Sequence, residues 1–389
     1  MGSRYIPRCS PDLRFSASRR YPFATGGAKW PIIDWDQRRS VDVYVEFVFK
    51  AVDKFINDLP ANVVQAELSK DGALLSSSSD LIRDRSWVPF SAPRTDFPCN
   101  VATVRRCDLT EVDRLGLQVD LTTYYLGPGE TRQVVFKYYF TENNVANWWH
   151  EANCVMRMPR HPNIVPIDAL VVDMVEGVDR VVGFTTRYIP GSTLSENKDC
   201  VFKLQYLEQL INAVDYLNLC LGIDNGCEFK YEKDCNDVKF VIFTLYEIIT
   251  REFCFRLEFY PHELDASKIM RKRKWDKHRN VQLDSPVDEF RRVLRKWFKE
   301  RAKVDKNIDH FMKASEPLDW LSLRVSPDMA TDQRLQRRGI LRSTLVQSGK
   351  DFLKWERPPT RALPLPDGQR LLATGEVVHD DESGSASAK

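Results

Sequence analysis

Residues 133–140 read Gln-Val-Val-Phe-Lys-Tyr-Tyr-Phe, and residues 158–165 read Met-Pro-Arg-His-Pro-Asn-Ile-Val. The first run is rich in β-branched and aromatic residues and predicts a strand with Lys137 inside it. Between the runs, small polar residues at 141–144 precede apolar residues that recur at helical spacing over 145–156. A strand, an amphipathic helix and a second strand are therefore expected in this order.

A carboxylate lies beside the apolar stripe of the predicted helix. Glu151 comes three residues after Trp148 and four residues before Val155, which places it next to the stripe rather than opposite it. A carboxylate on an inward face needs a cation, and Lys137 on the preceding strand is the nearest candidate in the sequence. The alternatives are an ion pair that only stabilises the fold, or two unrelated surface residues.

These residues resemble the protein kinase family. Val134-Val135-Phe136-Lys137 is similar to the strand that carries the nucleotide-binding lysine of kinases, and Glu151 resembles its partner on the first large helix. The run at 158–165 is similar to the kinase turn after that helix. The resemblance implies an α+β, protein-kinase-like bilobal fold, with a small β-rich lobe that includes one large helix and a mainly α-helical second lobe. It also implies ATP and Mg²⁺ as cofactors, positioned in part by Lys137 and Glu151.

Two further apolar runs, at 164–172 and 181–189, predict paired strands joined by a polar turn. They lead into Tyr-Ile-Pro-Gly-Ser-Thr-Leu at 188–194, which resembles the kinase hinge, where backbone groups beyond a gatekeeper side chain bind adenine. Three residues are carried over by position as nucleotide contacts: Thr186 as the gatekeeper, and Arg187 and Ile189 through their backbone. The alternative is a strand that ends in a Pro-Gly turn, which any α+β domain can contain.

Two apolar helices are expected next, at 202–221 and from Asp237 to about residue 249. The first is apolar on most sides, which predicts that it is buried. They resemble the long helix before the kinase catalytic loop and the central helix of the large lobe. In kinases the first Asp of that central helix binds the backbone of the catalytic loop, whereas Asp237 is interpreted here as an N-cap.

The connection between these two helices is too short for a kinase. Kinases place there a His-x-Asp loop, a metal-binding Asn, an Asp-Phe-Gly turn and an activation segment. Only the fourteen residues from Gly222 to Cys235 separate the helices in this chain. A kinase also carries a glycine-rich loop before the lysine strand, where this chain offers Gly116 alone. No catalytic or metal-binding residue is therefore assigned, nucleotide binding is expected to be weak or absent, and apolar surface on both helices is expected to be exposed.

The composition is that of a globular protein in a reducing compartment. The 389 residues are 43% hydrophobic and 29% charged, and a net charge of +2 gives no electrostatic case for a nucleic-acid partner. The N-terminus lacks the apolar core of a secretory signal, and the most apolar run, 240–249, is too short to span a bilayer. The nine cysteines include no Cys-x-x-Cys pair, so neither a zinc site nor a disulfide framework is expected. We expect an intracellular protein, in the cytoplasm or alternatively the nucleus, with no membrane partner.

The remaining segments give shorter patterns. Three lie near the N-terminus: 41–59 drifts from strand to helix spacing, 74–80 contains four serines and predicts a flexible loop, and 89–100 reads as an extended linker. The basic run at 271–279 is interpreted as a solvated helix face, with nuclear localisation or nucleic-acid binding as the alternative. Ser285 and Pro286 are expected to open a helix whose aromatic stripe, over 287–298, belongs to a core.

Five segments are expected: a partly ordered N-terminal extension at 1–100, a kinase-like small lobe at 101–190, a truncated helical lobe at 191–325, a helical extension at 326–355 and a mostly disordered tail at 356–389. The motifs together look most like a fungal subgroup of kinase-like proteins. The first hypothesis is a catalytically inactive kinase-like protein, a pseudokinase, that acts by binding a protein partner. The second is an ATP-dependent Ser/Thr-type protein kinase whose sequence here lacks an internal segment. The third is an α+β interaction domain unrelated to kinases.

Overall fold

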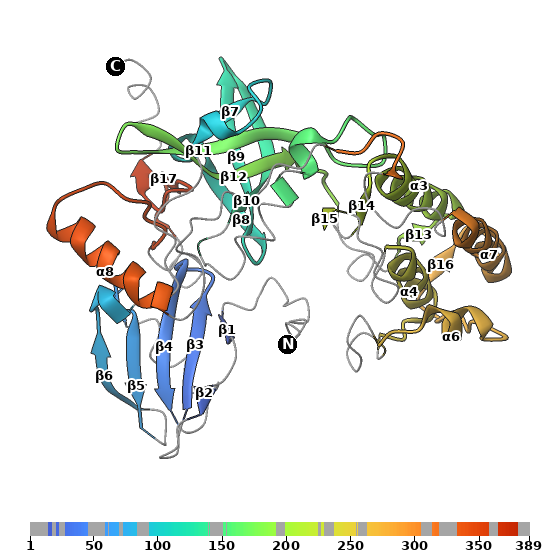
Figure 1. Ribbon diagram of the computed structural model, residues 1–389, viewed down its shortest axis with the longest axis horizontal. Helices are drawn as coiled ribbons and strands as arrows, with labels where there is room; N and C mark the ends of the chain where they lie inside the picture. The colour runs from blue at the N-terminus through green and yellow to red at the C-terminus, as the bar shows by residue number, and fades with distance from the viewer. Residues whose placement is uncertain are drawn as a thin grey trace. The chain divides into compact units, whose positions relative to one another are not determined.

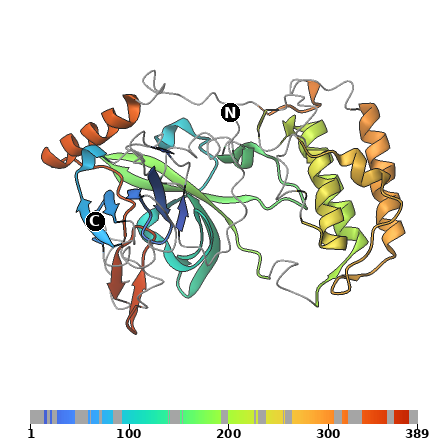
Figure 2. The same cartoon turned by 90° about the horizontal axis from the view of Figure 1, so that it is seen from below.

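In the computed structural model the contacts divide the chain into two compact units, drawn in Figures 1 and 2. The residues described are 15–17, 21–22, 28–45, 59–60, 62–69, 73–83, 93–138, 140, 151–152, 154–191, 199–224, 227–228, 237–253, 255, 263–304, 313–318, 333–357 and 365–379. The helical unit comprises the described residues of 151–166 and 189–318, and the sheet unit those of 15–140, 167–188 and 333–379. The sheet unit is thus built from three stretches that are separate in sequence.

The lysine strand lies in the middle of a mixed sheet in the sheet unit. The strands are β7 (Thr103–Arg105), β8 (Thr110–Gly116), β9 (Val119–Gly127), β10 (Glu130–Tyr138), β11 (Ile167–Val175) and β12 (Val178–Arg187). Their order is β7-β11-β12-β10-β9-β8, antiparallel throughout except for the parallel pair β7–β11. The strands predicted around Lys137 and at 164–172 and 181–189 are confirmed as β10, β11 and β12.

A second sheet, which the sequence did not predict, is formed by the N-terminal residues. Its strands are β1 (Phe15–Ala17), β2 (Tyr21–Pro22), β3 (Ala28–Asp34), β4 (Arg39–Val45), β5 (Gln65–Leu68) and β6 (Leu74–Ser78), in the order β1-β3-β4-β5-β6 with β2 also beside β3. β4 confirms strand structure at the start of 41–59, and residues 46–58 lie outside the described part. The flexible loop predicted at 74–80 is wrong, because β6 pairs with β5 through backbone hydrogen bonds that a serine-rich composition does not prevent.

The segment expected to be an extended linker is anchored to the sheet unit over its described part, 93–100. Pro93 bridges to Arg180 on β12, and η2 (Arg94–Asp96) follows as a short 3₁₀ turn. The Arg94 guanidinium donates to the carbonyl oxygens of Phe97 and Val101 at 3.1 and 2.8 Å. Because Phe97 is also buried, the linker prediction is wrong here.

Residues near the C-terminus complete the core of the sheet unit. Within the segment predicted as a helical extension, α8 (Gln333–Gln347) is a helix, and Leu353 and Trp355 pack in one cluster with Val134 and Phe136 of β10. The short hairpin of β17 (Gln369–Leu371) and β18 (Val377–His379), red in Figure 2, contradicts the disordered tail predicted there. Local strand pairing stabilises this hairpin although its sequence shows no periodicity, and residues 380–389 lie outside the described part.

The helical unit packs its main helices around one apolar core (Figure 1). These are α3 (Leu204–Asp215) with the π-helical turn η5 (Tyr216–Cys220), α4 (Asp237–Thr250), α6 (Ala266–Arg271) and α7 (Val287–Val304). Two short strand pairs accompany them: β13 (Val201–Phe202) with β16 (Gln282–Leu283), and β14 (Ile223–Asp224) with β15 (Cys227–Glu228). None of the helices in the described ranges has the length and apolar character needed to cross a bilayer.

The burial of these helices differs from the expectation in two ways. α4 is buried along most of its length, so the exposed apolar surface predicted for it is wrong. α3 buries only Leu207, Ala213 and Val214, because polar residues such as Gln205 and Glu208 alternate with its apolar ones and face outward. The sequence therefore described α4 better than α3, which is amphipathic rather than buried on most sides.

The remaining helical predictions are confirmed in part. The described residues between 151 and 157 are helical, with Ala152, Cys154 and Met156 buried, and they belong to the helical unit; the predicted start at 141–144 lies outside the described part. The core stripe of α7 is confirmed by Phe290, Leu294 and Trp297. Most of the basic run at 271–279 is exposed as predicted, but it is not a helix face, since α6 ends at Arg271 and Trp275 then turns into the core.

Candidate functional site

The candidate nucleotide-binding face is the side of the sheet on which Lys137 lies. Lys137 stands opposite Phe184, and Val135 stands opposite Thr186. Since directly opposed residues of antiparallel strands share a face, the register brings Lys137 and the predicted gatekeeper Thr186 to the same side. The Lys137 ammonium lies 5.9 Å from the centre of the Phe184 ring, within the range of a cation–π contact.

A close approach of two strands supports this face. A Cβ added at Gly183 would lie 2.4 Å from the carbonyl oxygen of Lys137 and 2.6 Å from the ring of Phe136. Glycine is therefore required there for β12 to pair closely with β10. Gly183 begins the Gly-Phe-Thr-Thr run of β12. Its role is to place Phe184 and Thr186.

The predicted site residues fall on both units. Lys137, Thr186 and Arg187 belong to the sheet unit, with Thr186 and Arg187 at the end of β12, whereas Glu151 and Ile189 belong to the helical unit. Ile189 is 63% exposed. The pairing of Lys137 with Glu151 and the hinge contacts of Arg187 and Ile189 stay predictions.

The turn between β8 and β9 does not fit the phosphates of a nucleoside triphosphate. The two strands stay paired up to Gly116 and Val119, so the turn consists of Leu117 and Gln118 alone. Gln118 has a φ of 60°, and its carbonyl oxygen accepts a hydrogen bond from the backbone of Tyr138. A two-residue turn with one flanking glycine offers no run of backbone N–H groups that could surround phosphates.

A polar cluster near the end of β12 was not predicted. Asp168 accepts hydrogen bonds from Tyr124 at 2.7 Å, Arg132 at 2.8 Å and Thr185 at 3.3 Å. Burial, followed by the hydrogen bond to Asp168, raises the pKa of Tyr124 to about 12. The signal in the sequence is an aspartate inside an apolar strand, which needs polar partners once the strand is buried.

In the helical unit, Asn218 joins the end of one helix to the start of the next. Its side-chain N–H groups donate to the Ile223 carbonyl at 2.6 Å and to the Asp237 carboxylate at 3.0 Å. Its carbonyl oxygen accepts from Arg301 at 3.0 Å, so the amide has partners on both sides. Asp237, interpreted from the sequence as an N-cap, thus makes a contact with the turn after α3.

The same junction is tied to α7. Arg301 donates to Asp215 at 2.7 Å, and the indole N–H of Trp297 donates to the same carboxylate at 2.9 Å. Only 1% of Asn218 and 3% of Arg301 is exposed. The ends of α3 and α4 are therefore held together by a buried polar network, and the described residues between them form only the short β14–β15 pair.

The His-Pro-Asn turn docks on α3. The Nε2 atom of His161 lies 3.0 Å from the Asn212 side-chain oxygen, and its ring stacks on Tyr216 with centroids 4.7 Å apart. The Asn163 amide donates to the Gln209 carbonyl at 3.3 Å. These contacts confirm a turn at this point and give both of its polar side chains a structural role.

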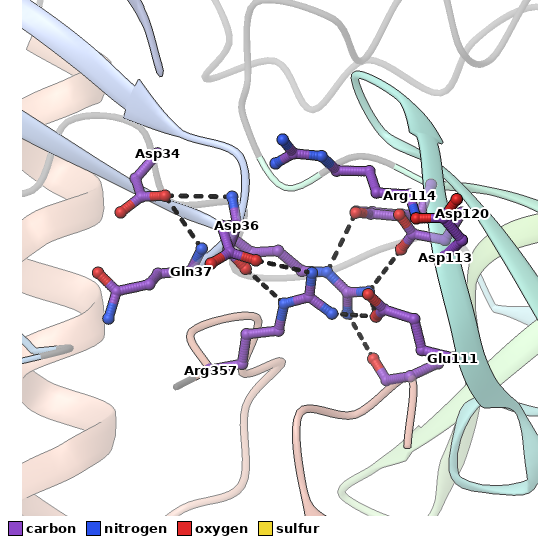
Figure 3. Close-up of polar contacts among 11 residues, drawn as sticks. Asp34, Asp36, Gln37, Glu111, Asp113, Arg114, Asp120 and Arg357 are labelled. Atoms are coloured by element: carbon purple, nitrogen blue, oxygen red, sulfur yellow. Dashed lines mark hydrogen bonds and ion pairs between the residues drawn. The ribbon is translucent and has the colours of Figure 1, made fainter. Parts of the chain in front are cut away.

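Among the described residues, the largest polar network that the sequence did not predict lies in the sheet unit (Figure 3). It includes Tyr138, which follows Lys137 on β10 and therefore lies on the other face of the strand. Arg38, in the turn between β3 and β4, donates to Tyr138 at 3.1 Å, to Glu111 at 3.1 Å and to Asp120 at 2.7 Å. It also donates to the Ala373 carbonyl. Arg38 therefore joins the N-terminal sheet, the central sheet and a C-terminal segment.

A second arginine closes this network. Arg357 forms an ion pair with Glu111, donates to the Asp36 carbonyl, and bonds through its backbone N–H to Gln37 at 3.1 Å. Figure 3 shows Arg357 and Glu111 facing each other beside Asp36. Tyr138 stacks on Trp355 with centroids 5.3 Å apart, so residues distant in sequence surround the two guanidinium groups.

Burial sets the electrostatics of the network. Burial and the neighbouring Glu111 raise the pKa of Asp120, whereas Arg38 and Arg357 oppose this rise. Burial also raises the pKa of Tyr138, so its phenol stays protonated. Burial alone would lower the pKa of Arg38, but Tyr138, Asp120 and Glu111 more than offset it and the pKa is raised. Arg38 is therefore a permanent cation in the core of the sheet unit.

Comparisons with known proteins leave the family open. No protein-family model matches the chain, and no curated protein matches its sequence. Among solved structures, the apo GRMZM2G135359 pseudokinase is similar at 12% identity, over 63% of this chain and 95% of that one, with a TM-score of 0.32. This similarity is too low to assign a fold. The chain is an α+β protein with mixed sheets, and within the described residues no three His, Cys, Asp or Glu side chains are grouped to hold a metal ion.

Proposed function

We propose that the chain is a kinase-like protein without phosphotransferase activity that acts by binding another protein. The observation that carries the proposal is the junction at Asn218, which connects the turn after α3 directly to Asp237 of α4. In-line phosphoryl transfer needs a base and metal-binding carboxylates between two such helices. Only sixteen residues, 221–236, lie between η5 and α4, and they contain no histidine.

Two features of the sheet unit support a kinase-like origin for an inactive domain. Lys137 lies on a central strand of five consecutive antiparallel strands, on the same face as Thr186. The tight β8–β9 turn does not suit a triphosphate, so a lysine strand remains without the loop that would cover the phosphates. Binding of a protein is the function that needs neither loop nor metal.

The test is a phosphotransfer assay with purified chain, ATP, Mg²⁺ and a generic protein substrate. We expect no transfer above that of the Lys137→Ala variant, and no rise in melting temperature with ATP, since a ligand that binds the native state raises its stability. Turnover that Lys137→Ala abolishes would refute the proposal.

The second candidate is an active Ser/Thr-type kinase whose sequence here lacks an internal segment. It is favoured by one observation, the intact packing of α3 and α4 in a single core on either side of the short connection. Sequencing the transcript across the codons for Leu221 to Asp237 decides between the two. Several dozen additional codons with His-x-Asp and Asp-Phe-Gly-like motifs would establish the kinase, and a confirmed junction would exclude it.

A further inference from the structure

We propose that the exposed face of α7 is a docking surface for an acidic, extended segment of a partner protein. The inference rests on the binding role proposed above and specifies the chemistry of the partner. It starts from a row of exposed basic residues on α7, called here the basic stripe: Arg292, Arg295, Lys296, Lys299 and Lys303.

The geometry of α7 places these residues in one line. The residues at 292, 296, 299 and 303 are three or four positions apart, and Arg295 adjoins Lys296. All five therefore occupy one side of the helix, opposite the side that buries Phe290, Leu294 and Trp297. At about 1.5 Å per residue the stripe is roughly 16 Å long. It is a narrow, straight surface on a helix whose other side is fixed in a core.

The charge of the stripe is not balanced locally. Residues 266–304 contain fourteen Lys and Arg against five Asp and Glu, a net charge of +9 in a chain whose total is +2. Within the stripe, Arg292 pairs with Glu289, whereas the other four basic side chains form no ion pair with described residues. Glu300 is the single acidic residue between Arg292 and Lys303.

Repulsion within the stripe favours binding of an anion. Like charges three or four residues apart on a helix are mutually destabilising, and the stripe contains several such pairs. The positive charge of the stripe also acts on Arg291. Burial lowers the pKa of Arg291, and the charge of Arg295 lowers it further. Arg291 in turn donates to the carbonyl of Arg273 at 2.9 Å, which holds the adjoining basic loop beside α7.

An acidic polypeptide fits this surface better than a membrane or a nucleic acid. No large apolar side chain is exposed between Arg292 and Lys303, so nothing on the stripe could insert into lipid. No aromatic side chain is exposed over 263–304, so bases would have no stacking platform. In an extended segment, side chains that point to the same side recur about every 6.7 Å. Successive turns of the stripe rise by about 4.5–6 Å, so acidic side chains at alternate positions of such a segment can each lie near a basic residue of the stripe.

The test measures binding of a fluorescent peptide of alternating Glu and Ser residues to the full chain by anisotropy. The stripe variant carries Arg295→Glu, Lys296→Glu and Lys299→Glu. The control variant carries the same change in charge at exposed residues elsewhere: Arg105→Glu, Arg160→Glu and Lys350→Glu. We expect the stripe variant to bind at least about tenfold more weakly and the control to bind like the wild type.

Equal weakening in both variants, or no binding to the wild type, would overturn the proposal. So would tighter binding of single-stranded DNA or of vesicles rich in phosphatidylserine than of the peptide, measured in parallel. If the stripe variant shows no melting transition, Lys299→Glu alone is compared with Lys350→Glu. Phosphotransfer by the wild type would refute the proposal that the chain is inactive. It would not change the difference in peptide binding between the stripe variant and the control, so each proposal can fail without the other.

Discussion

Replacing Arg38 by alanine tests whether the buried ion network holds the sheet unit together. Arg38 donates hydrogen bonds to four acceptors, and its side chain is fully buried. The acceptors are the Tyr138 hydroxyl, the Glu111 and Asp120 carboxylates and the Ala373 carbonyl. Removing one partner of a buried ion pair costs about 3–5 kcal/mol, because the remaining charge loses its compensation. For a unit of this size that corresponds to a fall of about 6–20 °C in melting temperature.

The stability lost by Arg38→Ala should depend on pH, and the direction of this dependence follows from the pKa of Asp120. Burial and Glu111 raise the pKa of this carboxyl above its ordinary value of 3.8, and Arg38→Ala removes a cation that opposes the rise. A carboxyl whose pKa is higher in the folded state favours folding at low pH, and this contribution is lost as the pH rises through the folded-state pKa. The variant should therefore lose more stability at about pH 7 than at about pH 5.

The assay is thermal unfolding of the wild type and the variants, followed by circular dichroism at both pH values. The matched control is Leu353→Ala, because Leu353 is buried in the same unit and its loss creates a cavity without changing a charge. We expect the control to lose about 2–5 kcal/mol equally at both pH values. A fall of less than about 3 °C for Arg38→Ala, or an equal fall at both pH values, would refute the reasoning.

Two further variants test the candidate site and the helix junction by the same unfolding assay. Gly183→Ala should destabilise the chain by more than about 2 kcal/mol, because the added Cβ meets the Lys137 backbone. Gly116→Ala should be nearly neutral, because its Cβ would approach nothing closer than 4.0 Å. Equal effects of the two variants would contradict the close approach of β12 to β10. Asn218→Ala should cost about 2 kcal/mol by leaving buried partners without hydrogen bonds, and the exposed Gln205→Ala on α3 should cost little; an unchanged Asn218→Ala melting curve would mean that the junction is not held by this amide.

The parts of the fold that the sequence predicted are those with a local periodic signal. β10, the β11–β12 hairpin, α4 and α7 each combine a regular apolar pattern with turn or cap residues at the ends. The register that puts Lys137 and Thr186 on one face follows from strand pairing between residues about 50 positions apart. The strands themselves could therefore be predicted from the sequence, whereas the face shared by Lys137 and Thr186 follows from how the strands pair.

The parts that could not be predicted depend on contacts between distant residues. Asp34 accepts hydrogen bonds from the backbone of Asp36 and Gln37, so the turn before Arg38 has a recognisable Asx pattern. Nothing in that pattern indicates that Arg38 meets Asp120 or that Arg357 meets Glu111. The same holds for β6, whose serines carry no strand periodicity and whose structure depends on pairing with β5.

The discontinuity of the sheet unit has a consequence for synthesis of the protein. Arg357 and its partner Asp36 are separated by 321 residues. At about 5–20 residues per second, the ribosome needs roughly 16–64 s to supply the second after the first has emerged. The helical unit, encoded between them, can complete its contacts during this interval. Glu111 and the apolar side chains that pack on Leu353 and Trp355 must instead wait for the C-terminal segment to emerge. Nascent chains stalled before residue 350 should therefore bind chaperones more strongly than the released protein.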